Sequence, residues 1–343
     1  MSSLEKKNNI YERKRLLDKV VKYFFLFLAL LCASFVIFIA VFITYKGIYP
    51  FFHNYSLIEG NYIHQDIDQF FTNSRWLYDG MGGMPFLLLT TLYTTLLSLV
   101  ISVPTSIFTA LLLVRIVPKF LKSILQSAVD LLASIPSVIY GLFGAGVICP
   151  IVASLGIETF GGRSILSGVI VLAMMSIPTM TTLSMNAMEA VDKKLIQSSI
   201  ALGASKAQTN FKIVIGTATS GIFAGIILGI GRALGEATAI QMVIGNNSLG
   251  TSFYNVFAPG NTLTSAMLAG IGEAAGIGYD VRFSLGLVLI IVILIISSLL
   301  SAIKQRMNPN YKKEDSLFYK MKSLRSEERR VGKECRSRWS PYH

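Results

Sequence analysis

The chain has 343 residues, of which 52% are hydrophobic and 15% are charged, and its formal net charge is +12. The hydrophobic residues are gathered in long runs that a soluble core rarely needs, so the composition argues against a soluble globular protein and predicts an all-α polytopic membrane protein. We interpret the excess of basic residues as a membrane-topology signal. A basic groove with interleaved aromatic residues is absent from the sequence, so no nucleic-acid partner is expected.

Six apolar runs of about 20 residues or more predict six transmembrane helices, because a helix must cross a hydrocarbon layer about 30 Å thick. The first run is too long for a cleaved signal peptide and lacks its small-residue exit, so we expect a retained signal anchor. The third run contains Pro136, which predicts a kink. The six predicted spans are 23–45, 86–114, 124–151, 165–183, 217–244 and 283–303.

Lysine and arginine lie mainly on one side of this six-helix arrangement. Twenty of them lie in the leader, the connection between the second and third spans, the loop before the fifth span and the tail after the sixth. The opposite side holds Lys46, Arg75, Arg163 and Arg282. By the positive-inside rule, we expect a multi-pass membrane protein with both termini in the cytoplasm. The domains are then a basic leader (1–22), a transmembrane domain (23–303) and a basic cytoplasmic tail (304–324).

The polar segment at about 186–216, between the fourth and fifth spans, has the pattern of two short helices joined by a sharp turn. Residues 195–202 and 205–214 each place apolar residues on one side, and Gly203 sits where the backbone must turn. A helix-turn-helix that projects from a membrane protein can insert into a groove on a soluble partner. An ordinary connecting loop is the alternative.

This segment resembles the cytoplasmic coupling loop of ATP-binding-cassette importer permeases, whose pattern is Glu-Ala-Ala, three residues, Gly, nine residues, then Ile-x-Leu-Pro. Gly203 and Ile213 keep that spacing. The sequence departs from the pattern where Gln-Ser-Ser replaces the triplet and Gly216 replaces the proline. The resemblance implies coupling to a separate ATPase through Gln197, Ser198, Ser199, Gly203, Ala204 and Ile213.

The fifth span carries a ladder of glycines. Gly221, Gly225 and Gly229 recur every four residues, and Gly231 and Gly235 form a second such step. Two faces of this helix are therefore expected to let another helix backbone come close.

Two charged residues, Arg232 and Glu236, lie in the same predicted span. They are four residues apart, so on a continuous helix they share one face and are able to pair. A charge at the membrane centre costs about 2.5–3.5 kcal/mol on insertion scales, so something must offset it. A salt bridge that locks helices together and an arginine on an anion path both remain open. Ser134 and Ser137 are candidates to line the same path, although membrane hydroxyls commonly bond to their own helix carbonyls.

The sequence contains no recognisable catalytic apparatus. A G-x-x-x-x-G-K-[ST] phosphate loop is absent, so ATP-driven transport would need the ATPase on another chain, and no cofactor is expected in this one. The three cysteines and three histidines have no metal-ligand spacing. Residues 325–343 are dense in charge and have no apolar stripe, so we expect vector read-through there, with a disordered native tail as the alternative.

Two further motifs narrow the family. ASIPSVIYGLFG at 133–144 and GRALGE at 231–236 resemble signatures of the two permease subunits of the bacterial phosphate importer. The continuation ATAIQMVIGN at 237–246, with Thr-Leu-Thr at 262–264, is similar to the PstC-type subunit rather than the PstA-type. The resemblance covers roughly 23–303 and implies the six-helix type I importer permease (MetI-like) fold and a location in the bacterial inner membrane.

The same resemblance implies a transport subunit without enzymatic activity. Its implied partners are a homologous PstA-type permease, two ATP-binding subunits, an extracytoplasmic phosphate-binding protein and membrane lipid. It also implies that Arg232 and Glu236 lie on or near a phosphate path. A permease for molybdate, tungstate or sulfate is an alternative. A secondary transporter or channel is a further alternative, which the loop spacing and the lack of a membrane-buried carboxylate series disfavour.

Overall fold

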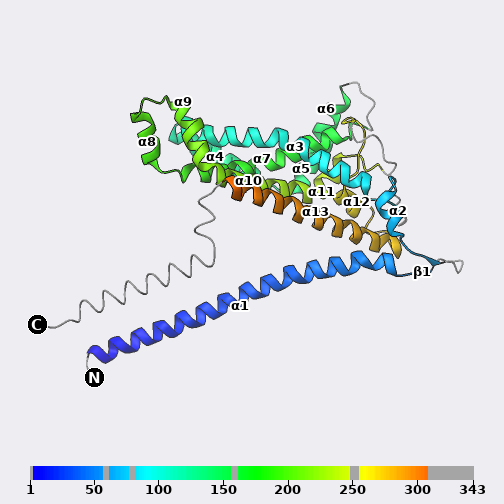
Figure 1. The fold of residues 1–343 in the computed structure, drawn as a ribbon, viewed down its shortest axis with the longest axis horizontal. Helices are drawn as coiled ribbons and strands as arrows, with labels where there is room; N and C mark the ends of the chain where they lie inside the picture. Colours follow the sequence, from blue (N-terminus) through cyan, green and yellow to red (C-terminus); the bar gives the residue numbers. More distant parts are fainter. Residues whose placement is uncertain (1–2, 57–61, 77–81, 156–160, 248–254, 308–343) are drawn as a thin grey trace, which may run out of the picture. The chain divides into compact units, whose positions relative to one another are not determined.

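The computed structural model describes residues 3–56, 62–76, 82–155, 161–247 and 255–307. The read-through prediction at 325–343 and most of the predicted tail at 304–324 lie outside the described residues. The named secondary-structure elements of the described residues are helices apart from one short hairpin (Figure 1). The chain divides into two compact units. Unit 1 is Met1–Pro85 with Gly270–Val288, and unit 2 is Phe86–Ala269 with Leu289–His343.

Among the described residues, five helical segments are long and apolar enough to cross a membrane, and one pair of helices passes the same test with a bend of 95°. Counted as one span, the bent pair completes the six predicted spans and confirms the all-α, multi-pass fold class. The five segments are Leu17–Phe52, Pro85–Ile116, Ile165–Glu189, Lys206–Gly235 and Ile277–Gln305, and the bent pair is Lys119–Ser134 with Ser137–Ala153.

Two of the predicted spans are interrupted. In the third, the predicted kink is a full break, because Ile135 and Pro136 are both extended and Pro136 disfavours helical backbone at the residue before it. The fifth was predicted to run to residue 244, and this end is wrong. Its helix stops at Gly235, Glu236 is extended with φ −74° and ψ 120°, and a new helix begins at Thr238.

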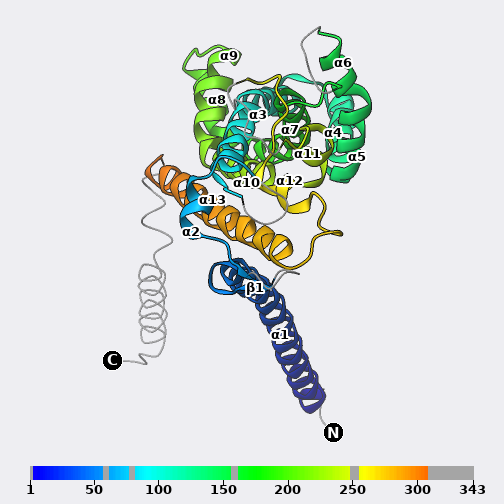
Figure 2. The same cartoon turned by 90° about the vertical axis from the view of Figure 1, so that its right-hand side faces the viewer.

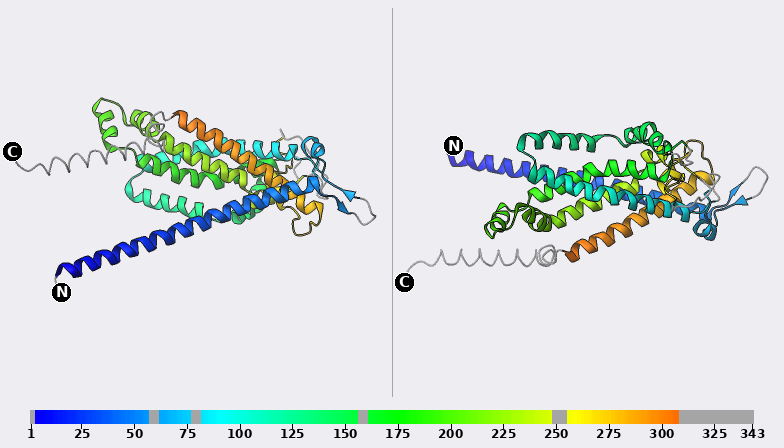
Figure 3. Two further views of the ribbon diagram at one scale, coloured as in Figure 1. Left: turned by 60° about the horizontal axis from the view of Figure 1, so that its bottom comes forward. Right: turned by 90° about the horizontal axis from the view of Figure 1, so that it is seen from above.

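Unit 2 is built around α7 (Ile165–Glu189), with α10 (Ile215–Gly235) on one side and α4 (Lys119–Ser134) and α5 (Ser137–Phe143) on another (Figure 2). The turn between α8 (Lys193–Ala201) and α9 (Lys206–Gln208) lies at one end of the α7–α10 pair (Figures 1 and 3). The helices α11 (Thr238–Val243) and α12 (Leu263–Leu268) lie at the other end.

The remaining helices are α3 (Pro85–Leu111), α6 (Cys149–Ala153) and α13 (Ile277–Met307). Three further segments of the described residues are π-helical: η1 (Leu112–Ile116), η2 (Gly144–Ile148) and η3 (Thr209–Val214).

Glycines set the close approach of α10 to α7. A Cβ added at Gly221 would lie 2.5 Å from the Cβ of Ala187, and one at Gly225 would lie 3.0 Å from the Cβ of Leu183. At Gly229 the added atom would lie 2.0 Å from the Cε of Met180. The three glycines therefore form the packing face of α10.

The second glycine step does not pack within this chain. An added Cβ at Gly231 or Gly235 would have no neighbour within 4 Å among the described residues. The close packing predicted at Gly235 is therefore not found in this structure. Gly235 is the last residue of α10, directly before the extended backbone at Glu236.

Residues 255–268, which end in α12, were not predicted as an element, and we call them the re-entrant segment because they fold back against two helix ends. The N–H of Ile165 donates to Ala258 O at 3.0 Å, and that of Gly260 donates to Ile244 O at 2.9 Å, which folds the segment back against the start of α7 and the end of α11. Its side chains are polar yet almost fully buried: Asn261 0%, Thr262 3%, Thr264 4% and Ser265 0% exposed. Such a segment needs internal hydrogen-bond partners.

Unit 1 contains α1 (Ser3–Phe52), a hairpin of β1 (Tyr55–Ser56) and β2 (Tyr62–Ile63), α2 (Ile67–Thr72) and the start of α13. Asp280 accepts from Lys46 Nζ at 3.1 Å and from the Tyr55 hydroxyl at 2.7 Å. Burial, followed by the hydrogen bond to Asp280, raises the pKa of Tyr55, so its phenol keeps the proton that it donates. The hydroxyl of Ser284 donates to Gly47 O at 2.7 Å, so the end of α1 is fastened to the start of α13.

Candidate functional site

The polar side chains of unit 2 gather where α10 ends and α11 begins. Glu236 follows the last residue of α10, and its Oε1 accepts from Thr238 Oγ1 and from the Ala239 N–H, both at 3.0 Å. The carboxylate thus caps the first turn of α11, where backbone N–H groups have no intrahelical partner and favour negative charge.

Two further hydroxyls extend this cluster to other elements. Ser137 Oγ lies 2.8 Å from Thr238 Oγ1, and Ser137 is the first residue of α5, directly after the break at Pro136. Thr264 Oγ1 on α12 donates to the main-chain oxygen of Glu236 at 2.7 Å. We call Ser137, Glu236, Thr238 and Thr264 the polar joint, because they link α5, α11, α12 and the end of α10.

Arg232 lies in the last turn of α10, half-buried, and its Nη1 donates to Thr179 Oγ1 on α7 at 2.7 Å. The salt bridge between Arg232 and Glu236, which the sequence left open as one alternative, is not formed in the described residues. The ion pairs among the described residues are Lys46–Asp280 and Lys122–Glu189. The physical reason is that α10 ends before Glu236, so the i, i+4 geometry is lost and the carboxylate turns to α11 instead.

The guanidinium of Arg232 is consequently not neutralised by a carboxylate of the described residues. It has five N–H donors, and its described hydrogen bond uses one of them. A planar fork of donors matches the oxygens of a carboxylate, phosphate or similar oxyanion. The arrangement is able to bind an anion without first breaking a salt bridge.

The two candidate serines behave differently. Ser137 belongs to the polar joint. Ser134 is exposed, and its hydroxyl donates to Leu131 O in its own helix at 2.7 Å. The structure therefore places Ser134 outside the cluster that contains Ser137.

The predicted two-helix turn is formed by α8, α9 and η3. Gly203 has φ +85°, its N–H donates to Ile200 O at 3.0 Å, and the N–H of Ala204 donates to Ser199 O at 3.2 Å. This pair of bonds is the Schellman arrangement, which requires a left-handed residue that glycine adopts without strain.

The surface of this turn is open. Leu202, at its tip, is 88% exposed, and Gln197 and Ser198 are also exposed. Ser199, Ala204 and Ile213 are half-buried, with Ser199 Oγ 3.0 Å from Thr209 Oγ1. A fully exposed leucine beside polar residues is suited to insertion into a groove on a partner.

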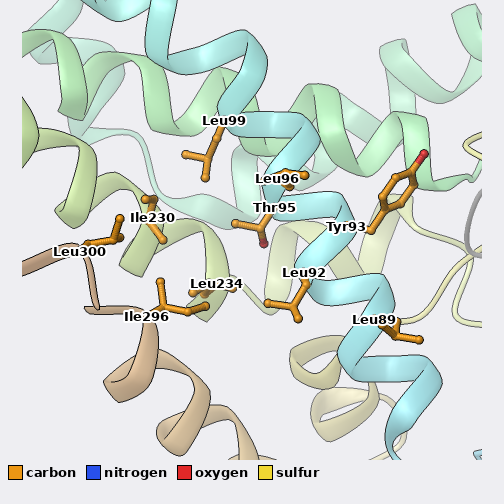
Figure 4. A pocket seen from close by; sticks show the side chains of 10 residues that line it. All are labelled: Leu89, Leu92, Tyr93, Thr95, Leu96, Leu99, Ile230, Leu234, Ile296 and Leu300. Carbon is orange, nitrogen blue, oxygen red and sulfur yellow. The ribbon is translucent and has the colours of Figure 1, made fainter. Parts of the chain in front are cut away.

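An apolar pocket of about 420 Å³ lies between α3, α10 and α13 (Figure 4). Tyr93 and Thr95 are the lining residues with polar atoms, and the rest are leucine and isoleucine. An anion placed there would lose its hydration without compensation, so the pocket is unsuited to an anion. Its lining is Leu89, Leu92, Tyr93, Thr95, Leu96, Leu99, Ile230, Leu234, Ile296 and Leu300.

Three residues of the site were not singled out from the sequence: Thr179, Thr238 and Thr264. Thr238 and Thr264 fall within motifs that resemble the phosphate permeases, and this was the available signal. Periodicity alone does not separate a hydroxyl that bonds across helices from one that bonds back to its own carbonyl, as Thr94 does to Thr90 O at 2.6 Å.

Comparison with known proteins adds a family and several relatives. The sequence profile described as "Binding-protein-dependent transport system inner membrane component" matches residues 102–313. A probable ABC transporter permease protein, YqgH, of Bacillus subtilis is 37% identical over 179 residues, covering 52% of this chain and 57% of that protein. The phosphate transport system permease protein PstC of Pasteurella multocida is 29% identical over 205 residues, covering 54% of this chain and 62% of that one.

The chain thus spans about three fifths of the length of these relatives. Among solved structures, a bacterial ABC transporter involved in the import of the acidic polysaccharide alginate is similar with a TM-score of 0.58. The match has 16% sequence identity and covers 85% of this chain and 99% of that one, so it supports the type I importer permease fold alone.

Proposed function

The chain belongs to the family of inner membrane components of binding-protein-dependent transport systems, and from this premise we propose that it is a permease subunit of an ATP-driven phosphate importer. The family is one of transport components, and ATP is hydrolysed by separate subunits. Phosphate as the substrate is supported by the resemblance of GRALGE and its continuation to phosphate permeases, and by the PstC proteins among the relatives.

The proposal rests on the position of Arg232 and on the groups that contact it. Arg232 lies in a membrane-spanning helix, it is half-buried, and it lacks a carboxylate partner among the described residues. Charged residues inside a membrane are rare and expensive, and they usually mark a substrate pathway when no structural pairing offsets them. Since the salt bridge between Arg232 and Glu236 is not formed, the position of Arg232 on an anion path is the better supported alternative.

The geometry also supports coupling of ATP hydrolysis on a partner subunit to movement of Arg232. Residues Lys206–Gly235 form one apolar helical segment of 30 residues, which at about 1.5 Å per residue is about 45 Å long. Its first residues belong to the α8–α9 turn and its last turn carries Arg232. In the proposed mechanism, movement of the turn by an ATPase shifts the whole segment and presents the anion path alternately to each side.

The proposed assembly contains this chain, a homologous PstA-type permease, two ATP-binding subunits and an extracytoplasmic phosphate-binding protein. Gln197, Ser198, Ser199, Gly203, Ala204 and Ile213 are the proposed coupling residues. We place the α8–α9 turn and both termini in the cytoplasm, because the turn carries exposed Lys193, Lys194, Lys206 and Lys212.

Reconstitution of the assembly in liposomes tests this function. We expect uptake of labelled phosphate that requires ATP and the binding protein, and that unlabelled phosphate suppresses while equal sulfate, molybdate or tungstate does not. Suppression by one of those anions at the same concentration would favour the oxyanion alternative. Uptake that continues without ATP would instead indicate a secondary transporter.

A further inference from the structure

Thr264 occupies an unusual place for a hydroxyl in a membrane protein. It is 4% exposed, on the short helix α12, and it donates to the main-chain oxygen of Glu236 at 2.7 Å. The N–H of Leu263, next to it, donates to Thr91 Oγ1 on α3 at 2.9 Å. The re-entrant segment is therefore held against two other elements by directed bonds rather than by apolar contact alone.

The hydrogen bond from Thr264 supplies a donor to the main-chain carbonyl of Glu236. Because α10 stops at Gly235, the carbonyl of Glu236 is not part of a helical ladder, and a carbonyl without a partner in the membrane interior is costly. Supplying that partner from α12 stabilises the extended backbone at Glu236. Without it, the peptide would gain from rotating toward another donor, and the side chain would move with it.

The Glu236 carboxylate is held from the opposite direction. Its Oε1 accepts from Thr238 and from the Ala239 N–H, both at 3.0 Å. Glu236 is thus fixed twice, at its main chain by α12 and at one carboxylate oxygen by α11. The hydrogen bonds that the described residues make to this carboxylate are at Oε1, which leaves Oε2 for a ligand or water.

We propose that Thr264 is a positioning residue for transport, which acts by fixing the peptide of Glu236 so that its carboxylate keeps one orientation at the end of α10. The inference rests on the proposed function, in which Glu236 and Arg232 lie on the anion path. Thr264 itself touches no substrate.

The chain offers a matched control. Thr90 on α3 is 0% exposed, and its Oγ1 has no hydrogen-bond partner within the part of the chain that the structure describes. Replacement of threonine by valine removes a hydroxyl at nearly constant volume. At Thr90 the replacement removes an unpaired polar group, and its effect on stability should be neutral or favourable. At Thr264 it leaves the Glu236 carbonyl without its hydrogen-bond donor.

The experiment measures uptake of labelled phosphate by the reconstituted assembly, normalised to the amount of assembled complex. For Thr264→Val we expect a drop of about 5- to 30-fold, the range that corresponds to one lost buried hydrogen bond. Thr264→Ser, which keeps the hydroxyl, should stay within about twofold of wild type, and so should Thr90→Val. If Thr264→Val does not assemble, Thr264→Ala and Thr264→Ser form the comparison, and equal uptake by these two would overturn the proposal.

A double-mutant cycle separates positioning from general loss of stability. Glu236→Gln removes the charge but keeps an oxygen that can cap α11. If Thr264 acts through Glu236, the double variant Thr264→Val with Glu236→Gln should transport no worse than Glu236→Gln alone. Multiplication of the two separate losses would mean that Thr264 acts independently, and would overturn the proposal.

The same variants distinguish this inference from the function on which it rests. Wild-type uptake by Glu236→Gln would remove Glu236 from the transport path, and the positioning role with it. A defective Glu236→Gln together with normal uptake by Thr264→Val would leave the path in place and refute the positioning role alone.

Discussion

Replacement of Gly221 by alanine tests the packing of α10 against α7. The new Cβ would lie 2.5 Å from the Cβ of Ala187, where ordinary contacts begin near 3.4 Å, a shortfall of about 0.9 Å. Both carbons are attached directly to helix backbones, so no rotamer change relieves the overlap and the helices must separate.

The magnitude follows from two opposing effects. Overpacking a close contact costs about 1–3 kcal/mol, and alanine recovers about 1 kcal/mol over glycine in a helix interior. The expected net destabilisation is about 1 kcal/mol, with an upper bound of about 2 kcal/mol. The unfolding midpoint should then fall by roughly 1–2 °C for each kcal/mol, since the entropy of unfolding grows with chain length.

Thermal unfolding of the purified protein in detergent measures this effect, with two companions. At Gly231 an added Cβ has no described residue within 4 Å, so Gly231→Ala should be neutral or slightly stabilising. Adding Ala187→Gly to Gly221→Ala removes the opposing methyl, after which the next atom is Ala187 Cα at 3.5 Å, so part of the loss should return. Equal midpoints for Gly221→Ala and Gly231→Ala would refute the packing argument.

The remaining predictions concern the α8–α9 turn and the topology. Gly203→Ala should cost about 1–2 kcal/mol, because its backbone has φ +85°, and it should weaken co-purification of the ATPase. Gly216→Ala is the control and should do neither, because Gly216 lies in a helix and an added Cβ has no described residue within 4 Å. Equal co-purification by the two variants would count against the turn as the coupling element. A cysteine that replaces exposed Asn255 should react with an impermeant thiol reagent added outside intact cells, and one that replaces exposed Ser205 should not. Labelling at Ser205 from outside would contradict the cytoplasmic position of the α8–α9 turn.

Much of the fold could be predicted because it depends on local patterns. Apolar runs gave the spans, and the four-residue spacing of Gly221, Gly225 and Gly229 gave the face that meets α7. The position of Gly203 likewise predicted a turn, since a left-handed residue at a helix end is usually glycine.

The end of α10 could not be predicted in the same way. The sequence from Ile215 to residue 244 is apolar enough to continue as one helix, and the interruption at Glu236 is stabilised by Thr264, which is 28 residues away. The helix α12 has six residues and is too short to be found by a search for long apolar runs. For the same reason the sequence could not decide whether Arg232 pairs with Glu236, because that pairing requires helical geometry to continue between the two residues.

The most direct test of the central claim is phosphate uptake by Arg232→Gln, normalised to assembled complex and measured beside Arg232→Lys. Because Arg232 does not pair with Glu236 among the described residues, the glutamine variant strands no carboxylate and should assemble normally. We expect it to lose at least about tenfold in uptake, equivalent to about 1.4 kcal/mol, while lysine retains the charge without the planar fork and falls between. Wild-type uptake by an assembled Arg232→Gln complex would contradict the assignment of Arg232 to an anion path.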